Sequence, residues 1–557
     1  MKKIIYYTLI ALAIGSAGCK KLLNEDVRTQ ISNVYINTPS GLEDGVRGCY
    51  ATLRFWYGSQ TGGWMTIFGT DEYMDGNADV TFPNYTANLN PANGAISGIW
   101  AALYKGINDC NTVIDAAPKI TMDETKKAQR VAEARALRAH YYFLLVQQFG
   151  PIQLSLTPTA TATRVATRSP LADVYRVIVD DLTYAIATLP PTTPDYGRVT
   201  KYIAENMLAK VYLTRAGSSA AVSTDYDNAA NMAKDVINKG GFKLLDNFSD
   251  LFSQPMKPNT ETLWACQFSN NPVSEPTIAP NANTTISAWN AANFDFCAGY
   301  EGFPGMVRDL ANGRPFAHYR PTSYMLGLYN KAVDTRFNQT FKTVYICNKP
   351  GTYTINGKSV TLKRGDTSTV ILDHEATAAE RNAVRYLLVA PSEFGPGVWP
   401  MNQKFQDSLR AGVNDSRGVK DVIIYRLAET YLIAAEALIM SGHPADAVPF
   451  VNTVRTRAAI KGATPAITAA NVAAMQVTTA DMSLDFILDE RARELSGEFM
   501  RWEDLVRTGK LLERVKKYNP VASVLIKPYH VLRPIPQTQI DRTEGNASAF
   551  PQNQGYN

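Results

Sequence analysis

Two stretches of this sequence look like copies of one structural unit. Residues 207–217 (MLAKVYLTRAG) and 432–442 (LIAAEALIMSG) each have a helical pattern that ends in glycine. A second, alanine-rich helical pattern follows each of them, over 226–237 and 445–458. Small residues that face large ones let paired helices pack closely, as in tetratricopeptide-type repeats. The pattern predicts a helical-repeat scaffold, with an ordinary helical hairpin as the alternative because the repeat spacing is irregular.

Further helices are predicted on both sides of a loop-rich stretch. Helical periodicity begins near Pro39, with Ser40 as the expected cap. In the first half, further helical patterns lie at about 97–117, 122–149, 170–188, 199–216 and 225–239. In the second half, a helical pattern returns at 419–440 and continues through residue 512.

The stretch between these helical blocks differs in composition. It is rich in Asn, Pro, Gly, Thr and aromatic residues, with strand-like runs at 342–347, 351–360 and 369–372. Long insertions on a rigid scaffold usually carry binding function. We therefore predict a mainly α fold, a tetratricopeptide-like helical-repeat scaffold with a loop-rich inserted region that contains short β-strands. The expected regions are an N-terminal helical region (39–244), the insertion with the ligand-binding candidates (245–420) and a C-terminal helical region (421–557).

The first residues of the chain have the features of an export signal. Two lysines precede an apolar segment, 4–14, that is shorter than the roughly 20 residues of a membrane span. Small residues then lead into Cys19, an arrangement that resembles a bacterial lipobox, whose cysteine is lipidated. The alternative is an ordinary signal peptide with an incidental cysteine. We predict a signal peptide (1–18), a lipidated Cys19 and a polar tether (19–38).

The charge of the chain does not favour nucleic-acid binding. There are 56 basic and 51 acidic side chains, and loss of Lys2 and Lys3 with the signal would reduce the excess to three. Such a small excess makes no basic surface for a phosphate backbone. Five cysteines besides Cys19 are widely spaced and show no metal-ligand pattern, so most are expected to be buried free thiols, with a disulfide as the alternative: Cys49, Cys110, Cys266, Cys297 and Cys347.

Several motifs follow one another in the order found in a known family. The most recognisable is 131–151 (VAEARALRAHYYFLLVQQFGP). The others are 100–115 (WAALYKGINDCNTVID), 320–322 (RPT), 426–438 (RLAETYLIAAEAL), 488–511 (LDERARELSGEFMRWEDLVRTGKL), 533–536 (RPIP) and 552–556 (QNQGY). Together they resemble the SusD/RagB family, the surface lipoproteins of Bacteroidetes nutrient-uptake systems. The resemblance extends from the lipobox to the last residues of the chain.

This resemblance implies a SusD-like fold and a binding protein rather than an enzyme, without cofactor or metal. Members of the family typically capture oligosaccharides at the cell surface and pass them to a SusC-like TonB-dependent transporter. For this chain we expect an outer-membrane lipoprotein that is anchored through Cys19 and faces the cell exterior. Its expected partners are such a transporter and a nutrient, above all an oligosaccharide or polysaccharide. The alternative is a transporter-associated protein- or peptide-binding helical-repeat module without a sugar site.

A secreted hydrolase is a further alternative, because Glu490, Glu494 and Glu498 could supply paired carboxylates. The same helix carries Arg491 and Arg493, so a network of ion pairs is the simpler prediction. The sequence contains no paired histidine motif, P-loop, dinucleotide fingerprint or nucleophile elbow. The same spacing argument predicts pairing within an earlier helix, among Glu133, Arg135 and Arg138.

Two groups of residues have the composition of a carbohydrate site. Sugar rings present apolar C–H faces that stack on aromatic rings, while amide, carboxylate and guanidinium groups bind hydroxyls. The first group is Trp56, Trp64, Tyr73, Asp75 and Asn77. The second group is Trp289, Asn293, Phe294, Tyr300, Arg320 and Tyr324. Core or loop packing is the alternative for each ring. A scaffold role also fits Asp71 and Arg320, and core packing is expected for Trp264 and Trp399.

Overall fold

The computed structural model describes residues 34–76, 82–254, 258–271 and 288–556. The predicted signal peptide, Cys19 and Asn77 lie outside these residues, as does the predicted tether up to residue 33. The last residues of that tether are already part of the fold, because Ile36 is buried and the Tyr35 hydroxyl donates to Asp44. The tether therefore ends earlier than predicted.

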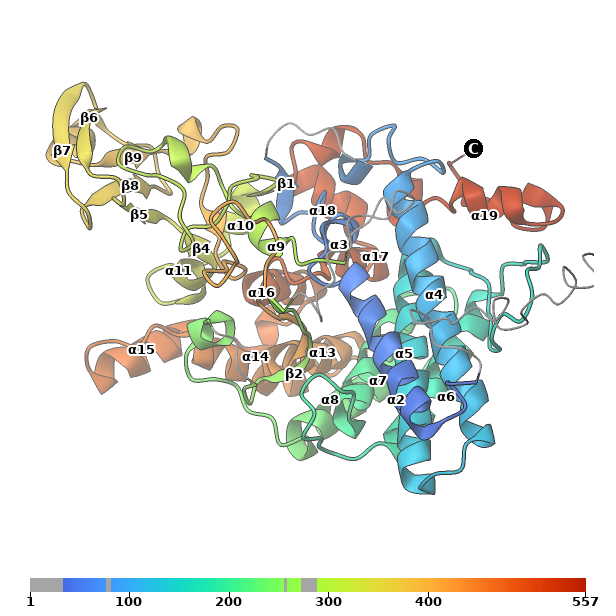
Figure 1. The fold of residues 1–557 in the computed structure, drawn as a ribbon. Coiled ribbons are helices and arrows are strands. Elements are labelled where there is room, and N and C mark those ends of the chain that lie inside the picture. The colour runs from blue at the N-terminus through green and yellow to red at the C-terminus, as the bar shows by residue number, and fades with distance from the viewer. Residues whose placement is uncertain (1–33, 77–81, 255–257, 272–287, 557) are drawn as a thin grey trace, which may run out of the picture.

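The first half of the chain is a continuous stack of helices. Its members are α4 (Gly94–Ala116), α5 (Glu124–Phe149), α6 (Leu171–Thr188), α7 (Lys201–Ala216) and α8 (Asp225–Lys239), and each packs against the next (Figure 1). These are the predicted helices, with bounds shifted by three residues at most. Helix α2 (Pro39–Ala51) packs against α4 and α5. Its predicted cap is wrong, since the hydroxyl of Thr38 and not Ser40 accepts the Gly41 N–H.

The second half continues this stack. Helix α13 (Leu427–Met440) packs against α8, although almost 190 residues separate their ends in the sequence. The two predicted repeat pairs are α7 with α8 and α13 with α14 (Pro444–Ala458), and the helices of each pair are in contact. The remaining helices of this half are α15 (Pro465–Met475), α16 (Leu484–Leu495), α17 (Arg501–Arg507), α18 (Leu511–Tyr518) and α19 (Gln537–Arg542).

The start of α13 corrects the predicted helix over 419–440. Residues Val422–Arg426 form a strand, β11, that pairs antiparallel with β2 (Thr262–Cys266). All five residues of β11 are buried, and two of them are isoleucines, which favour a pleated strand between packed layers. This pair of strands therefore carries the chain out of the helical stack and back into it.

The strands of the insertion form small separate sheets. The largest joins β5 (Val344–Ile346), β8 (Thr367–Ile371) and β9 (Leu387–Val389), and Figure 1 places it at the opposite end of the molecule from α4 and α6. The predicted strand run 351–360 is a hairpin instead, because Asn356 and Gly357 both have positive φ angles and turn the chain. The remaining pairs are β6 (Gly351–Ile355) with β7 (Lys358–Leu362), β1 (Tyr73–Asp75) with β3 (Tyr319–Pro321), and β4 (Phe341–Lys342) with β10 (Met401–Asn402).

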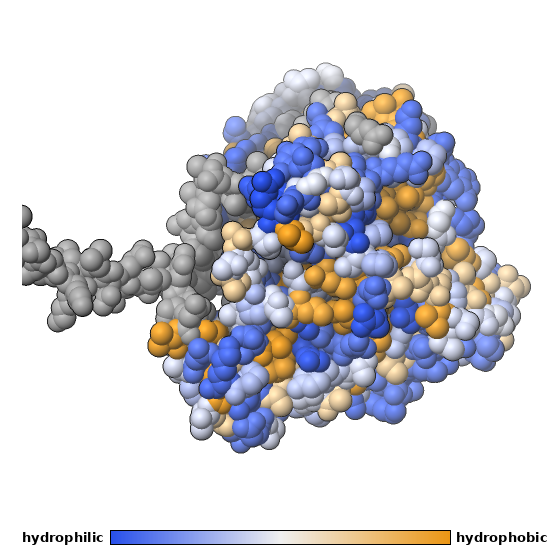
Figure 2. Space-filling model, turned by 90° about the vertical axis from the view of Figure 1, so that its right-hand side faces the viewer, coloured by the Kyte–Doolittle hydropathy of each residue, from blue (hydrophilic) through white to orange (hydrophobic). Residues whose placement is uncertain are grey.

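The interior and the surface agree with an ordinary globular body. The five predicted thiols are buried and free, and Trp264 and Trp399 are buried as expected. Figure 2 shows the face on the side of α4, where hydrophobic and hydrophilic residues are interspersed. Among the described residues, no helix combines the length and hydrophobicity that a membrane crossing requires.

Candidate functional site

Rings from two neighbouring segments stack on one another beside α9 (Ala292–Asp295). The ring centroids of Phe294 and Phe316 lie 4.2 Å apart and their planes differ by 11°. The Arg314 guanidinium carbon lies 5.0 Å from the centre of the Phe294 ring. On the other side, the His318 ring lies 4.1 Å from the Phe316 ring. Backbone bonds hold the two segments together, as the His318 N–H donates to the Asp295 carbonyl at 3.1 Å.

A third segment, α3 (Gln60–Thr66), adds a tryptophan to this stack. The ring of Trp64 lies 6.2 Å from the ring of His318. The Gln60 amide donates to the Asp295 carboxylate at 3.0 Å, so α3 is fastened to α9. We call the resulting set of five side chains the aromatic cluster: Trp64, Phe294, Arg314, Phe316 and His318.

The aromatic cluster combines partly exposed rings with one cationic donor. Trp64, Phe294, Arg314 and Phe316 are half-buried, whereas His318 is fully buried and supports the others. Partly exposed rings offer apolar surface to the C–H faces of a sugar, and a guanidinium donates to hydroxyls. Beneath them, burial raises the pKa of Asp295, against the effect of the hydrogen bonds from His318 and Gln60. The cluster thus has the chemistry of a carbohydrate-binding surface on a rigid base.

Four of the predicted ligand residues are buried, which corrects those predictions. Trp56, Tyr73 and Tyr300 are each 1% exposed or less, so their rings have no surface on which a sugar could stack. Asn293 is 4% exposed, and its amide donates to the carbonyl of Ser416. The sequence could not separate these residues from surface residues, because rings of the same type fill cores and line sites.

The other predicted residues lie in different surroundings. Trp289 is half-buried at the start of the segment that leads into α9, close in sequence to the aromatic cluster. Asp75 accepts a hydrogen bond from Asn84 at 3.2 Å. The Tyr324 hydroxyl donates to Asp489 at 2.6 Å, and its ring stacks on Tyr518 away from the cluster. The structure therefore unites only Trp64 and Phe294 from the two predicted groups.

The sequence-based prediction did not include the remaining members of the cluster. Arg314, Phe316 and His318 occur at alternate positions in the run RPFAHYR. This alternation was a usable signal, although the positive φ of Ala317 shows that the segment is not a regular strand. The run contributes Arg314 and Phe316 to the surface of the cluster and His318 to its buried base.

The charged residues of α16 form the predicted ion-pair network. Arg426 Nη1 lies 2.7 Å from Glu494 Oε1, and its Nε lies 2.8 Å from Glu498 Oε2. Arg336 Nη1 lies 2.8 Å from Glu490 Oε1. Burial would raise the pKa of Glu494, but the guanidinium groups of Arg457 and Arg426 outweigh it and lower that pKa. We call these groups the α16 network: Arg336, Arg426, Arg457, Glu490, Glu494 and Glu498.

The α16 network does not have the properties of a hydrolase site. A glycosidase acid needs a carboxyl with a raised pKa next to the substrate. The pKa values of Glu490, Glu494 and Glu498 are all lowered, and the three side chains are buried. These carboxylates therefore hold the helices together.

Other charged residues also have structural partners. Asp71 is fully buried and accepts hydrogen bonds from Arg501 and Arg514 at 2.7 Å each, which confirms its scaffold role. Glu133, Arg135 and Arg138 of α5 do not pair with one another as predicted. Glu133 pairs within the helix with Arg130 instead, and the further partners lie on neighbouring segments. Glu133 pairs with Arg198, and Arg138 pairs with Asp181.

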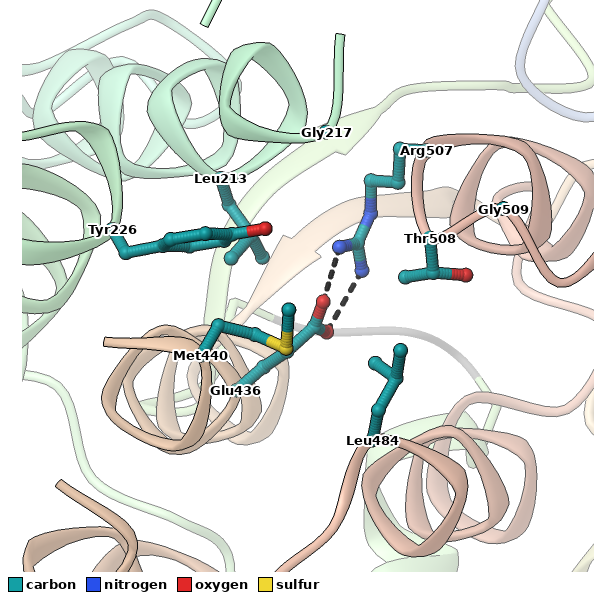
Figure 3. A pocket seen from close by; sticks show the side chains of 9 residues that line it. All are labelled: Leu213, Gly217, Tyr226, Glu436, Met440, Leu484, Arg507, Thr508 and Gly509. Carbon is teal, nitrogen blue, oxygen red and sulfur yellow. Dashed lines mark hydrogen bonds and ion pairs between the residues drawn. The ribbon is translucent and has the colours of Figure 1, made fainter. Parts of the chain in front are cut away.

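A small pocket lies between the repeat helices. It has a volume of about 260 Å³ and is lined by residues of α7, α8, α13, α16 and α17. Figure 3 shows Arg507 and Glu436 facing each other across it, with Arg507 Nη2 2.9 Å from Glu436 Oε2. The Tyr226 ring and Leu213 lie to one side. Because the guanidinium and the carboxylate neutralise each other, this pocket presents a paired charge to any ligand.

A family model described as "SusD family" matches residues 260–556, more than half of the chain. The chain belongs to the SusD family. A second model, described as "Starch-binding associating with outer membrane", matches residues 67–213. Membership of the SusD family supports a binding protein rather than an enzyme.

Individual SusD-like proteins match nearly the full length of the chain. A SusD-like protein of Bacteroides ovatus is 26% identical over 530 residues, which cover 90% of this chain and 82% of that protein. SusD-like protein P25 of Formosa agariphila is 24% identical over 590 residues, which cover 100% of this chain and 99% of the relative.

Solved structures show the same fold. A laminarin-binding SusD-like protein matches with a TM-score of 0.68 and 24% identity, covering 93% of this chain and 100% of the other. A SusD homologue from Bacteroides thetaiotaomicron matches with a TM-score of 0.69 and 22% identity, covering 94% and 98%. These likenesses confirm the predicted SusD-like, mainly α fold.

Proposed function

We propose that this protein binds a glycan at the aromatic cluster and works in nutrient uptake at the outer membrane. The observation that carries the proposal is the half-buried stack of Phe294 and Phe316, flanked by Arg314 and Trp64. Membership of the SusD family supports it, as do the descriptions of a laminarin-binding relative and of a starch-binding family model. The rigid helical stack would hold the loops that carry the rings.

The proposed role includes a lipid anchor and a transporter. Acylation of Cys19 would keep the protein at the outer membrane, and a SusC-like TonB-dependent transporter would receive the captured glycan. Fractionation of cells that express Cys19→Ser tests the anchor, because this variant should leave the membrane fraction. Co-purification of a TonB-dependent transporter with the wild-type protein tests the partner. Recovery of Cys19→Ser in the membrane fraction at the wild-type level would contradict the anchor.

Affinity electrophoresis against a panel of neutral and acidic polysaccharides tests glycan binding. The protein should migrate more slowly in gels that contain at least one polymer than in a gel without polymer. A protein of similar size without glycan affinity serves as the mobility standard. Unchanged mobility across the whole panel would argue against a sugar site.

A peptide-binding role is the second candidate, and the pocket of Figure 3 favours it. That pocket lies between paired helices, where solenoid proteins hold extended ligands. The paired charge of Arg507 and Glu436 would meet the ends or polar groups of a peptide. Leu213→Trp would fill the pocket and should abolish peptide capture while glycan retardation persists.

A further inference from the structure

A second pocket lies in the insertion and contains one arginine in unusual surroundings. Its volume is about 420 Å³, within the range of small-molecule sites. None of the residues of the aromatic cluster lines it. We call it the Arg320 pocket, and besides Arg320 its lining includes Ser323, Leu326, Lys331, Asp373 and Phe394.

The backbone around Arg320 is firmly held. Strand β3 pairs with β1, and Arg320 lies opposite Met74 in this ladder. Two residues later, the Thr322 hydroxyl donates to the Asp71 carbonyl at 2.6 Å and caps α10 (Ser323–Gly327). The backbone position of Arg320 is therefore fixed by a sheet on one side and a capped helix on the other.

The surroundings of Arg320 differ from those of the arginines in the α16 network. Its Nε is buried and has no hydrogen-bond partner among the residues that the structure describes. Burial lowers the pKa of Arg320, and no carboxylate of the described residues raises it in compensation. Carboxylates surround Arg336 and Arg426, by contrast, and raise their pKa values despite burial. A half-buried guanidinium without a carboxylate partner is free to bind an anion that enters the pocket.

The only other cation in the pocket lining is already neutralised. Lys331 Nζ lies 2.8 Å from Asp373 Oδ2, and it also lies 3.9 Å from the centre of the Phe337 ring. The rest of the wall is mainly apolar, with two hydroxyls and one amide. The pocket thus offers one strong anion partner, an apolar surface and a few hydroxyl and amide groups.

We propose that the Arg320 pocket binds the oxyanion of an acidic sugar, a carboxylate or a sulfate ester, through the guanidinium of Arg320. The sugar ring would lie against the apolar wall that includes Leu326 and Phe394. The choice of a sugar rests on the proposed function, whereas the requirement for an anion rests on the pocket itself. Guanidinium groups bind both planar carboxylates and tetrahedral sulfates through paired N–H donors.

Isothermal titration calorimetry with three matched trisaccharides tests this proposal. The probes are galactotriose, trigalacturonate and a monosulfated galactotriose. At least one of the two anionic probes should bind saturably and more tightly than the neutral probe, and the better one identifies the oxyanion. Arg320→Gln should weaken that binding at least about tenfold, since it removes a charge-assisted bond. Equal binding of all three probes, or wild-type affinity in Arg320→Gln, would overturn the proposal.

Three further variants test for a folding defect and separate this site from the aromatic cluster. Ser323 is exposed in the first turn of α10, where an acidic residue is tolerated. Ser323→Asp should therefore repel the anion without unfolding the protein, while the neutral Ser323→Asn, which adds no charge, should lose far less affinity. Phe316 does not line the Arg320 pocket, so Phe316→Ala should change anion binding by no more than about twofold. Loss of anion binding in Phe316→Ala but not in Ser323→Asp would place the anion at the aromatic cluster and overturn the proposal.

Discussion

Around α16, arginine side chains are buried among carboxylates, whereas Arg314 lies half-exposed over a phenylalanine ring in the aromatic cluster. In the α16 network, Arg426 meets three carboxylates, those of Glu261, Glu494 and Glu498. In the aromatic cluster, Arg314 donates to one backbone carbonyl, that of Asn414, at 3.0 Å. Buried polar groups that are fully paired specify and stabilise a fold. Polar and aromatic groups with exposed surface are available to a ligand. Variants of the α16 network should therefore lose stability, whereas variants of the aromatic cluster should lose affinity for a ligand.

The largest effect is expected from removing the central cation of the α16 network. Arg426→Met leaves three buried carboxylates without their shared partner. The expected loss in the free energy of unfolding is about 3–5 kcal/mol, the usual cost of one unpaired buried charge. Urea denaturation measures it. Arg176→Met, which breaks an exposed pair with Asp173, should cost less than about 1 kcal/mol. Similar losses in both variants would contradict the stabilising role of the α16 network.

Acid should weaken the α16 network, because its buried carboxylates lose their charge. The pKa of Glu494 is lowered from 4.5 to about 2 in the folded protein. Its contribution to stability is therefore complete above pH 4.5 and is lost as the pH falls toward 2. Burial raises the pKa values of Glu72 and Glu503 to about 7, so their titration affects stability only above this window.

We expect the free energy of unfolding to fall by a few kcal/mol between about pH 4.5 and about pH 2.5. Urea titrations at intervals across this window measure the slope. Glu494→Gln removes one titrating group, so its slope should be shallower than that of the wild type. A free energy of unfolding that stays level or increases on acidification would contradict the assigned role of the network.

In the aromatic cluster, Trp64→Ala should affect binding more than stability. Removing a large ring from a binding surface typically costs about 2 kcal/mol of binding free energy, or roughly thirtyfold in affinity. Calorimetry with the polysaccharide that retards the wild-type protein measures this loss. The half-buried Tyr184 of α6 supplies the control, since Tyr184→Ala should bind normally. A Trp64→Ala protein with wild-type affinity would remove α3 from the site.

The smallest effect is expected from Arg314→Gln. The side chain keeps one amide donor but loses its charge and its contact with the Phe294 ring. An exposed cation–π contact is worth about 0.5–1 kcal/mol, so the affinity for a neutral glycan should fall by about two- to fivefold. Stability should stay within about 0.5 kcal/mol of the wild type, because the residue lies at the surface. A larger loss of stability than of affinity would show that Arg314 supports the fold rather than a ligand.

The helices could be predicted well from the sequence and the site only in part. Helical periodicity located α4 to α8 closely, because each helix buries a regular pattern of apolar residues. The strand β11 was missed because a short, fully buried run looks the same in a helix and in a strand. Contact between α8 and α13 across the insertion is long-range and leaves no local signal.

The sequence also does not show which of the candidate site residues are exposed. Trp64 and Trp56 are eight positions apart and chemically identical, yet one is half-buried and the other fully buried. Packing between distant segments decides this, since Trp64 meets His318 from the insertion. The alternating residues of 314–318 could have been recognised, whereas the partner of each ring could not.

Affinity electrophoresis of the double variant Phe294→Ala/Phe316→Ala tests the aromatic cluster most directly. These two rings form its closest stack, at 4.2 Å. The variant should migrate like the mobility standard in the polysaccharide gel that retards the wild-type protein, while Tyr184→Ala remains retarded. Circular dichroism should show an unchanged helical fold in both. Full retardation of the folded double variant would contradict glycan binding at the aromatic cluster.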